Sequence, residues 1–261
     1  MKDTVKIIFF DIDGTSYSHR ISNIYETTKL AINTLKNNGY KIGFITGRSI
    51  SEMKHLPKFY NEFKWDACIY EGGALAYINN RCVYDNPIDS RAVNKILKLA
   101  NENDMTVRYT TKSGTYFMNK AKQEVKDIFF RLYLMVPCIK CYENENIYNL
   151  LVYYNEDINK RKIKDVVHNL EVIDLKDALE ICNRDVNKFN AIKHILEYYN
   201  YDLDNVMAFG DGYNDIPMIS NVKYGIAVGN SCYDLKKVSY DVCDSIHNDG
   251  IYNYLKDKLF I

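Results

Sequence analysis

The sequence has no surplus of either charge sign. Lys and Arg total 34, Asp and Glu also total 34, and the formal net charge at pH 7 is zero. A basic surplus is the electrostatic signature of chains that bind nucleic acid or anionic membranes. The composition therefore gives no reason to expect a nucleic-acid partner, and an anionic ligand would have to be attracted by a local site.

Long apolar runs are also missing. No stretch approaches the roughly 18 apolar residues that a membrane-spanning helix needs. The N-terminus, MKDTVKIIFFDID, has a short apolar run that stops at acidic residues, and it lacks the small-residue cleavage site of a signal peptide. This segment predicts a buried strand. We expect no membrane partner and, by default, a cytoplasmic location.

The cysteine pattern lacks a second ligand pair. There are seven cysteines, an odd number without a secretion signal, so reduced thiols are expected. Cys138 and Cys141 form one CxxC, but no second CxxC or nearby His pair completes a zinc site. Small, partly buried residues are the preferred interpretation of this pair, and the sequence does not determine its role.

The first third of the chain alternates between strand and helix patterns. Hydrophobic residues make up 47% of the 261 residues, enough for a substantial core. Strand–helix–strand alternation predicts parallel strands joined by right-handed crossovers, hence an α/β fold with a doubly wound, Rossmann-like sheet. The expected strands are Lys6–Phe10, Lys41–Ile45 and Ala67–Tyr70, and the expected helices are Tyr25–Asn38 and Ser49–Phe59.

The pattern changes in the middle of the chain. Ala74–Tyr77 and Cys82–Tyr84, separated by Asn79-Asn80, predict a β-hairpin. Further helix and strand patterns follow, among them a helix over about Ala121–Leu134, and they indicate an inserted α+β cap domain. After Val186 the first pattern returns, with strands over Asn205–Phe209 and Tyr224–Val228. We therefore predict a core domain made of residues 1–84 and 186–261 and a cap over residues 85–185.

The first chemical motif, Asp11-Ile12-Asp13-Gly14-Thr15, follows the first expected strand. Ligands bind at the carboxyl ends of strands in an open parallel sheet. Two carboxylates at such an exit are costly to keep ionised without a cation, and oxygen ligands favour Mg²⁺ over zinc. An EF-hand is excluded, because glycine comes at the fourth position and no Glu closes the loop. Taken alone, the motif is equally compatible with an acidic turn that caps a helix.

Two further motifs also follow strands. Thr46-Gly47-Arg48 offers a hydroxyl and backbone N–H groups at a helix start, which can cradle a phosphate, although a plain helix cap is the commoner meaning. Gly210-Asp211-Gly212-Tyr213-Asn214-Asp215 offers carboxylates to a metal site, or forms a glycine-rich turn with an Asn-Asp cap. Lys188 lies between these motifs, at the start of an expected helix, where a single lysine is usually a solvated charge.

Together the motifs fit one reaction. Phosphoryl transfer requires in-line attack and neutralisation of the charge on the transferred oxygens. Asp11 is the candidate nucleophile, and Asp13 would protonate the leaving alcohol and then deprotonate the attacking water. Mg²⁺ held by Asp11 and Asp211, with Lys188 as a second cation, would offset the repulsion between carboxylate and phosphate. Thr46 and Gly47 would hold a phosphate oxygen.

The ordered motifs, DIDGT, TGR, a lysine and GDGYND, resemble those of the haloacid dehalogenase superfamily. The mid-chain insertion, together with Gly229-Asn230-Ser231 and Asn248-Asp249-Gly250, is most similar to the Cof-type phosphatases with a C2B cap. The resemblance implies an aspartyl-phosphate intermediate on Asp11 and acid–base chemistry at Asp13. It implies Mg²⁺ bound by the Asp11 side chain, the Asp13 carbonyl and Asp211, with Asp215 nearby or acting through water. Asn214 is placed with the phosphate-binding residues.

Three positions depart from the family pattern. Phe189 stands where glycine often follows the lysine, and this could change the local pocket. Gly72-Gly73-Ala74 replaces a common Asn-Gly-Ala, which puts any contact of that Asn in doubt. Ser16 replaces an apolar residue common after the first motif, and we expect this to matter little.

The predicted activity is Mg²⁺-dependent hydrolysis of a small phosphorylated metabolite, such as a sugar phosphate or a phosphorylated cofactor. A phosphomutase would share every motif, so it stays an alternative, as does a catalytically weak binding protein. A phosphorylatable receiver domain is disfavoured, because such domains are about half this length and lack an equivalent of GDGYND. The sequence fixes neither the substrate nor the oligomeric state.

Overall fold

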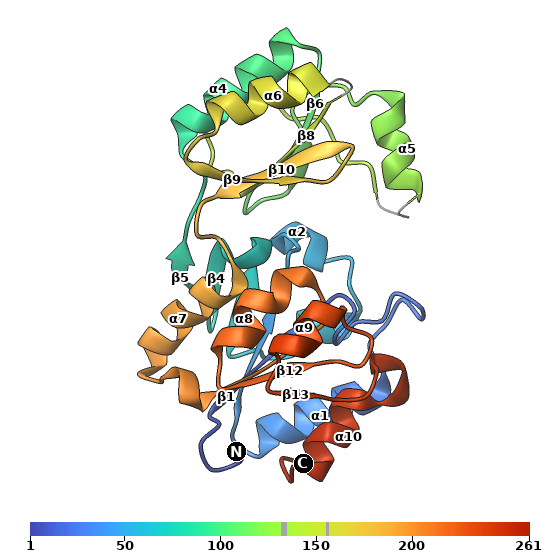
Figure 1. Ribbon diagram of the computed structural model, residues 1–261, viewed down its shortest axis with the longest axis vertical. Helices are drawn as coiled ribbons and strands as arrows, with labels where there is room; N and C mark the ends of the chain where they lie inside the picture. Colours follow the sequence, from blue (N-terminus) through green and yellow to red (C-terminus); the bar gives the residue numbers. More distant parts are fainter. Residues whose placement is uncertain (132–134, 155–156) are drawn as a thin grey trace. The chain divides into compact units, whose positions relative to one another are not determined.

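The computed structural model describes residues 1–131, 135–154 and 157–261, which form two compact units (Figure 1). The core unit comprises Met1–Arg48, Met53–Asp85 and Asn187–Ile261, and the inserted unit comprises Ser49–Glu52 and Asn86–Val186. Among these residues, no helix has the length and apolar character needed to cross a membrane.

The core unit is built on an eight-stranded sheet in which the first strand is central. From one edge the strands are β13 (Asp241–Val242), β12 (Tyr224–Ala227), β11 (Val206–Gly210), β1 (Ile7–Asp11), β2 (Lys41–Ile45), β3 (Ala67–Tyr70), β4 (Leu75–Ile78) and β5 (Arg81–Asp85). The first six run parallel, and β4 and β5 continue the sheet antiparallel. Because β1 pairs with both β2 and β11, segments from both ends of the chain build one sheet. The predicted α/β fold is confirmed.

Helices cover both faces of this sheet. Alternate residues of β1 point to opposite faces, as in any strand. Ile8 and Phe10 pack in one apolar cluster with α1 (Glu26–Asn37) and α10 (Gly250–Asp257), whereas Ile7 and Phe9 pack in another with α7 (Lys188–Tyr199) and α8 (Ile216–Asn221). The second cluster also includes Leu235 from α9 (Tyr233–Val238). Short 3₁₀ helices complete the unit: η1 (Glu71–Gly73), η2 (Leu203–Asn205), η3 (Tyr213–Asp215) and η4 (Ile246–Asn248).

The single helix predicted over Ser49–Phe59 is wrong. The structure has two short helices, α2 (Ile50–Met53) and α3 (Lys58–Glu62), with Pro57 at the start of the second. Proline lacks the N–H that a continuous helix needs and disfavours helical backbone in the preceding residue. The predicted hairpin is confirmed in β4 and β5, where Asn79 and Asn80 have φ of 47° and 66°, the left-handed values of a tight hairpin turn.

The inserted unit contains a five-stranded antiparallel sheet. Its strands are β7 (Thr115–Phe117), β6 (Thr106–Thr110), β8 (Asn149–Tyr153), β10 (Ala178–Asn183) and β9 (Leu170–Asp174), in that order. Residues of α4 (Ser90–Glu102) and α6 (Asp157–Val166) share an apolar cluster with one face, and α5 (Gln123–Arg131) packs with Phe117 in a second cluster. The strand β9 has no counterpart in the predicted elements. The end of the helix predicted over 121–134 lies outside the described residues.

The two cysteines of the CxxC segment are exposed. The chain between them lies alongside Phe117, whose N–H donates to the carbonyl of Cys138 and whose carbonyl accepts from Lys140, both at 2.9 Å. Both cysteines are free thiols in the structure.

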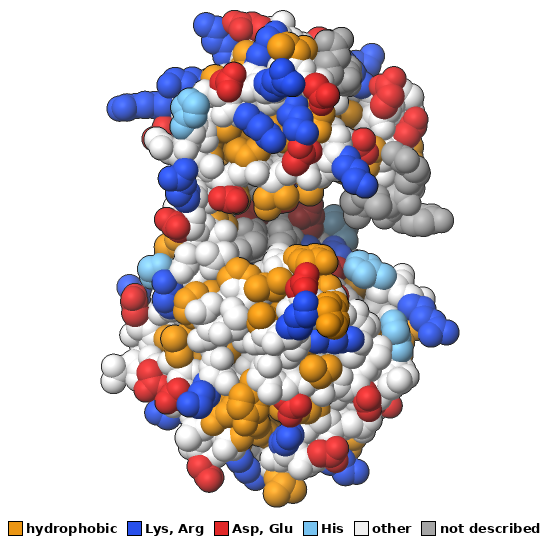
Figure 2. Space-filling model, in the orientation of Figure 1, with side chains coloured by type: hydrophobic (Ala, Val, Ile, Leu, Met, Phe, Trp, Pro, Cys, Tyr) orange, Lys and Arg blue, Asp and Glu red, His pale blue; other side chains and the backbone are white. Residues whose placement is uncertain are grey.

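Charged side chains of both signs are mixed over the face shown in Figure 2. This distribution agrees with the equal numbers of basic and acidic residues in the chain. With a formal net charge of zero, the chain as a whole gives no long-range attraction for an anion.

Candidate active site

The first motif begins at the end of β1 and turns sharply. Asp11, the last residue of β1, is buried, and the turn closes through bonds from Ser16 N and Tyr17 N to the carbonyls of Asp11 and Ile12. Gly14 has φ of 84°, and a Cβ at this position would lie 2.2 Å from Asp211 Oδ2. Glycine is therefore required here, because the backbone of this turn approaches the carboxylate of the third motif directly.

Three carboxylates converge beside this turn. Ligand oxygens of Asp11, Asp211 and Asp215 all lie within 4.8 Å of one another, and this is the one such group found among the described residues. Thr15 Oγ1 donates to Asp211 Oδ1 at 3.1 Å. Asp215 Oδ2 accepts from the N–H groups of Asp211 and Gly212, at 2.9 and 3.0 Å. The motifs at the ends of β1 and β11 are thus joined, as the parallel pairing of these strands predicts.

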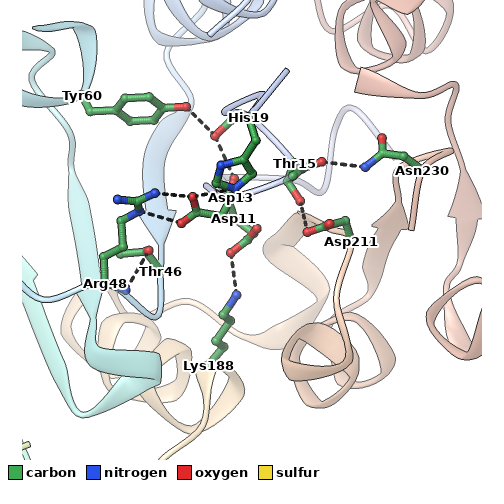
Figure 3. Close-up of polar contacts among 12 residues, drawn as sticks. Asp11, Asp13, Thr15, His19, Thr46, Arg48, Tyr60, Lys188, Asp211 and Asn230 are labelled. Carbon is green, nitrogen blue, oxygen red and sulfur yellow. Dashed lines mark hydrogen bonds and ion pairs between the residues drawn. The ribbon is translucent and has the colours of Figure 1, made fainter. Parts of the chain in front are cut away.

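Lys188 supplies the positive charge of this group. Its side chain is 1% exposed, and Nζ donates to Asp11 Oδ1 at 2.5 Å (Figure 3). It also donates to Asp215 Oδ1 at 2.6 Å. The lysine begins α7, whose preceding residue, Asn187, accepts a capping bond from Asn190 N. Gly73 allows this helix start to approach, because a Cβ there would lie 2.3 Å from the carbonyl oxygen of Asn187.

The charges of the group are strongly coupled. Burial, followed by the Asp215 carboxylate, raises the pKa of Asp11 well above its ordinary value, although Lys188 opposes this. Burial and then Asp215 also raise the pKa of Asp211 to about 6. For Lys188, burial disfavours the charged form, but the two carboxylates outweigh it and raise its pKa. One ammonium does not balance three carboxylates, so a divalent cation fits the electrostatics of the site.

Asp13 lies apart from the three carboxylates. Arg48 binds it in a bidentate manner, with Nε to Oδ2 at 2.7 Å and Nη2 to Oδ1 at 2.6 Å. His19 Nε2 lies 3.2 Å from Asp13 Oδ1 (Figure 3). The second motif includes Arg48 but predicts no role for it, and His19 is not among the predicted site residues. The signal for Arg48 was its place directly after a strand of the same sheet, whereas nothing in the sequence marks His19.

The second motif contributes a buried hydroxyl. Thr46 follows β2, is 1% exposed, and accepts a bond from Arg48 N through Oγ1 at 3.0 Å. Gly47 is exposed between these two residues. Asn214 is also exposed, on η3 between Asp211 and Asp215, and takes no part in the hydrogen bonds described above. The structure thus gathers Asp11, Lys188, Asp211 and Asp215 into one group, and places Asp13, Thr46 and Gly47 beside the neighbouring strand.

A further residue fixes the first motif from the opposite side. Asn230 Nδ2 donates to the Gly14 carbonyl at 2.8 Å, while its Oδ1 accepts from Ile246 N at 3.0 Å. In the sequence, Asn230 stands out only through the resemblance of Gly229-Asn230-Ser231 to the family pattern. A partner 216 residues away along the chain could not be identified from local pattern.

Comparison with known proteins decides the family. The model of the haloacid dehalogenase-like hydrolases matches residues 8–255. The chain belongs to this family. A Bacillus subtilis protein named "Putative phosphatase YkrA" is 27% identical over 270 residues, covering 97% of both chains. An HMP-PP phosphatase of Klebsiella pneumoniae is 24% identical, covering 88% of this chain and 86% of its own.

The fold of this family member also matches solved structures. BT1666 from Bacteroides thetaiotaomicron, described among phosphatases of the same superfamily, superposes with a TM-score of 0.84 at 24% identity. The match covers 99% of this chain and 96% of that one. These comparisons confirm the predicted superfamily and the prediction of a phosphatase.

Proposed function

We propose that this hydrolase cleaves small phosphate monoesters through a phosphorylated Asp11, with Mg²⁺ as its cofactor. The observation that carries the proposal is the group formed by the buried Asp11 and Asp215 and the half-buried Asp211 with Lys188, next to an Asp13 held by arginine. A carboxylate nucleophile, a cation site and a separate acid–base residue are the parts that this reaction needs.

In the first step, a carboxylate oxygen of Asp11 attacks phosphorus, the bond to the ester oxygen breaks, and Asp13 gives its proton to the departing alcohol. In the second, Asp13 takes a proton from water, whose oxygen attacks the phosphoaspartate and releases inorganic phosphate and the free Asp11 carboxylate. Lys188, Thr46 and Gly47 hold the phosphoryl oxygens, and Asn214 supports them from η3.

Asp11 and Asp211 are the side chains we assign to Mg²⁺, together with the main-chain carbonyl of Asp13. Both oxygens of Asp215 accept hydrogen bonds from Lys188 or from main-chain N–H groups, which favours a role in orienting the other ligands. Bound Mg²⁺ supplies positive charge that offsets the repulsion between carboxylate and phosphate. We assign the chemistry to residues 1–84 and 186–261, and we assign residues 85–185 to the cap.

The test is phosphate release from a panel of sugar phosphates and phosphorylated cofactors, with Mg²⁺ or with EDTA. Asp11→Asn is expected to lower kcat by about 10³-fold or more. The exposed Asp3→Asn serves as a matched control and should keep wild-type activity. Acid quenching during turnover should trap wild-type protein carrying one extra phosphoryl group.

Other outcomes identify other functions. Formation of an isomeric sugar phosphate without free phosphate would indicate a phosphomutase. Phosphate release that persists in Asp11→Asn would refute the proposed nucleophile. Release that is unchanged by EDTA would refute the assigned cofactor.

A further inference from the structure

A buried hydroxyl pair lies behind the nucleophile. Ser16, 1% exposed, donates through Oγ to the main-chain carbonyl of Asp11 at 2.8 Å, and its N–H is shared between this oxygen at 3.2 Å and the Ile12 carbonyl at 3.0 Å. Tyr60 in turn donates its hydroxyl to Ser16 Oγ at 3.0 Å (Figure 3). The serine that takes the place of a common apolar residue therefore acts both as a hydrogen-bond donor and as an acceptor.

Tyr60 is itself held rigidly. It lies in α3, is 3% exposed, and stacks on Trp65 with ring planes 10° apart. Trp65 Nε1 donates to the Tyr60 carbonyl at 2.9 Å, which fixes the main chain as well. Burial raises the pKa of Tyr60, so its hydroxyl keeps the proton that it donates. The chain of hydrogen bonds thus runs from a packed aromatic cluster to the peptide group of Asp11.

This peptide group controls where the nucleophile points. A single methylene group joins the Asp11 carboxylate to the main chain, and β1 ends at Asp11, so pairing with β2 no longer fixes the chain beyond it. The carbonyl that accepts both bonds from Ser16 belongs to the first peptide of the turn. In-line attack is sensitive to displacement, and an error of about 1 Å can cost about 10²-fold in rate.

We propose that Ser16 and Tyr60 are a positioning pair that fixes the main chain of Asp11 and thereby aligns its carboxylate for attack. We assign the pair no contact with the substrate or the phosphoryl group, and its role rests on the proposed function of Asp11. It also explains why a polar residue is tolerated at a fully buried position, since every hydroxyl of the pair has a partner.

The test uses the full chain and compares three single variants with a double one. Ser16→Ala and Tyr60→Phe are each expected to lower kcat about tenfold, the factor for loss of one well-oriented hydrogen bond, with KM nearly unchanged. The double variant should be no slower than the worse single one, because both act through the same carbonyl. Ser16→Thr, which retains the hydroxyl, should recover most of the lost rate.

Ser18→Ala is the matched control. Ser18 is equally buried two residues further on, but its hydroxyl has no hydrogen-bond partner in the described part of the chain. This variant should keep kcat within about twofold. Equal losses of kcat in Ser18→Ala and Ser16→Ala, or unchanged kcat in both Ser16→Ala and Tyr60→Phe, would overturn the proposal.

Amide hydrogen exchange separates this proposal from the proposed function. Ser16→Ala should speed exchange over residues 12–17, and Ser18→Ala should not. A wild-type chain that releases no phosphate would refute the proposed function, and the exchange data would still decide whether the pair fixes the turn. Unchanged exchange in Ser16→Ala would refute the pair whether or not the wild type is active.

Discussion

Positive charge is divided between two neighbouring carboxylate groups. Lys188 donates hydrogen bonds to Asp11 and Asp215, whereas Arg48 donates hydrogen bonds to Asp13. The division keeps the candidate acid–base residue on a different cation from the candidate nucleophile. The two carboxylates of the first motif, only two residues apart, can therefore have different chemical roles.

Removal of the buried Lys188 ammonium should make the stability of the protein more dependent on pH. In Lys188→Met, Asp11 and Asp215 lose their shared partner, so the pKa of Asp11, already raised by burial and by Asp215, rises further above its unfolded value. A raised carboxyl pKa contributes stability at low pH that is lost as pH rises, so the variant should be weakest at neutral pH. In EDTA near pH 7.5 we expect a loss of about 3–5 kcal/mol in the free energy of unfolding, measured by urea titration, and a smaller loss near pH 5.

The exposed Lys193→Met, on the same helix, should change stability by less than about 0.5 kcal/mol and serves as the control. A Lys188→Met variant that lost equal stability at both pH values would contradict the assigned charge balance.

Arg48→Lys should separate the acid step from the rest of the reaction. Lysine keeps the charge but cannot hold both oxygens of Asp13. Hydrolysis of alkyl phosphates, whose leaving group needs a proton, should slow by about tenfold or more. Nitrophenyl phosphate, whose leaving group departs without a proton, should be affected much less. The exposed Arg20→Lys is the control, and equal slowing of both substrates would show that Arg48 does not act through Asp13.

The effect of Mg²⁺ on stability should depend on pH. The pKa of Asp211 in the metal-free protein is raised to about 6 by burial and by Asp215, so below that pH a proton occupies a proposed ligand. Metal ions bind the deprotonated ligand, so Mg²⁺ should raise Tm more near pH 7.5 than near pH 5. Thermal melts with Mg²⁺ and with EDTA measure this. Asp211→Asn should remove the difference, and a larger Mg²⁺ effect at the lower pH would contradict the assignment.

At the scale of elements, the sequence predicts what depends on local pattern. The strands β1, β2 and β3 and the order of the motifs follow from apolar runs and from the residues directly after them. The prediction of one helix over 49–59 is wrong because it relied on the helical spacing of apolar residues and neglected Pro57, which breaks the helix. The edge strand β9 was not predicted, because its residues are mostly exposed and apolar and polar residues do not alternate strongly along it. The hydrogen-bond partners of Arg48 and Asn230 are distant along the chain and are brought close only by the tertiary fold, so short stretches of sequence cannot identify them.

The junction between η1 and α7 is a sensitive element contact. In Gly73→Ala, the new Cβ would meet the Asn187 carbonyl, and φ of 114° is strained for any L-residue. Relief would shift the start of α7 and move Lys188, so we expect a loss of about 2–4 kcal/mol and a lower kcat. Gly72→Ala is the matched control, with φ of 65° but no atom within 4 Å of the new Cβ, and should cost about 1 kcal/mol without loss of kcat. Equal effects of the two variants would show that the approach to Asn187 is unimportant.

At the scale of the whole molecule, each of the two units has its own apolar core, but the proposed metal ligands all lie in the core unit. The apolar clusters around β1 belong to the core unit, and those around α4 to α6 belong to the inserted unit. Every side chain that we assign to Mg²⁺ comes from the core unit. The chain leaves the core unit after β5 and returns to it at Asn187. Lys188, the first residue of α7, therefore lies directly after the point of return.

Ligand binding should therefore stabilise the two units unequally. Mg²⁺ at about 100 times its Kd adds about 2.7 kcal/mol to whatever folds around it. Amide exchange followed by mass spectrometry should show slower exchange in β1 and β11 on adding Mg²⁺, with β6 and β8 of the inserted unit changed far less. Asp211→Asn should abolish the protection of β1 and β11. Equal protection of both units would mean that they unfold as one cooperative body, and the metal site would then stabilise the whole chain.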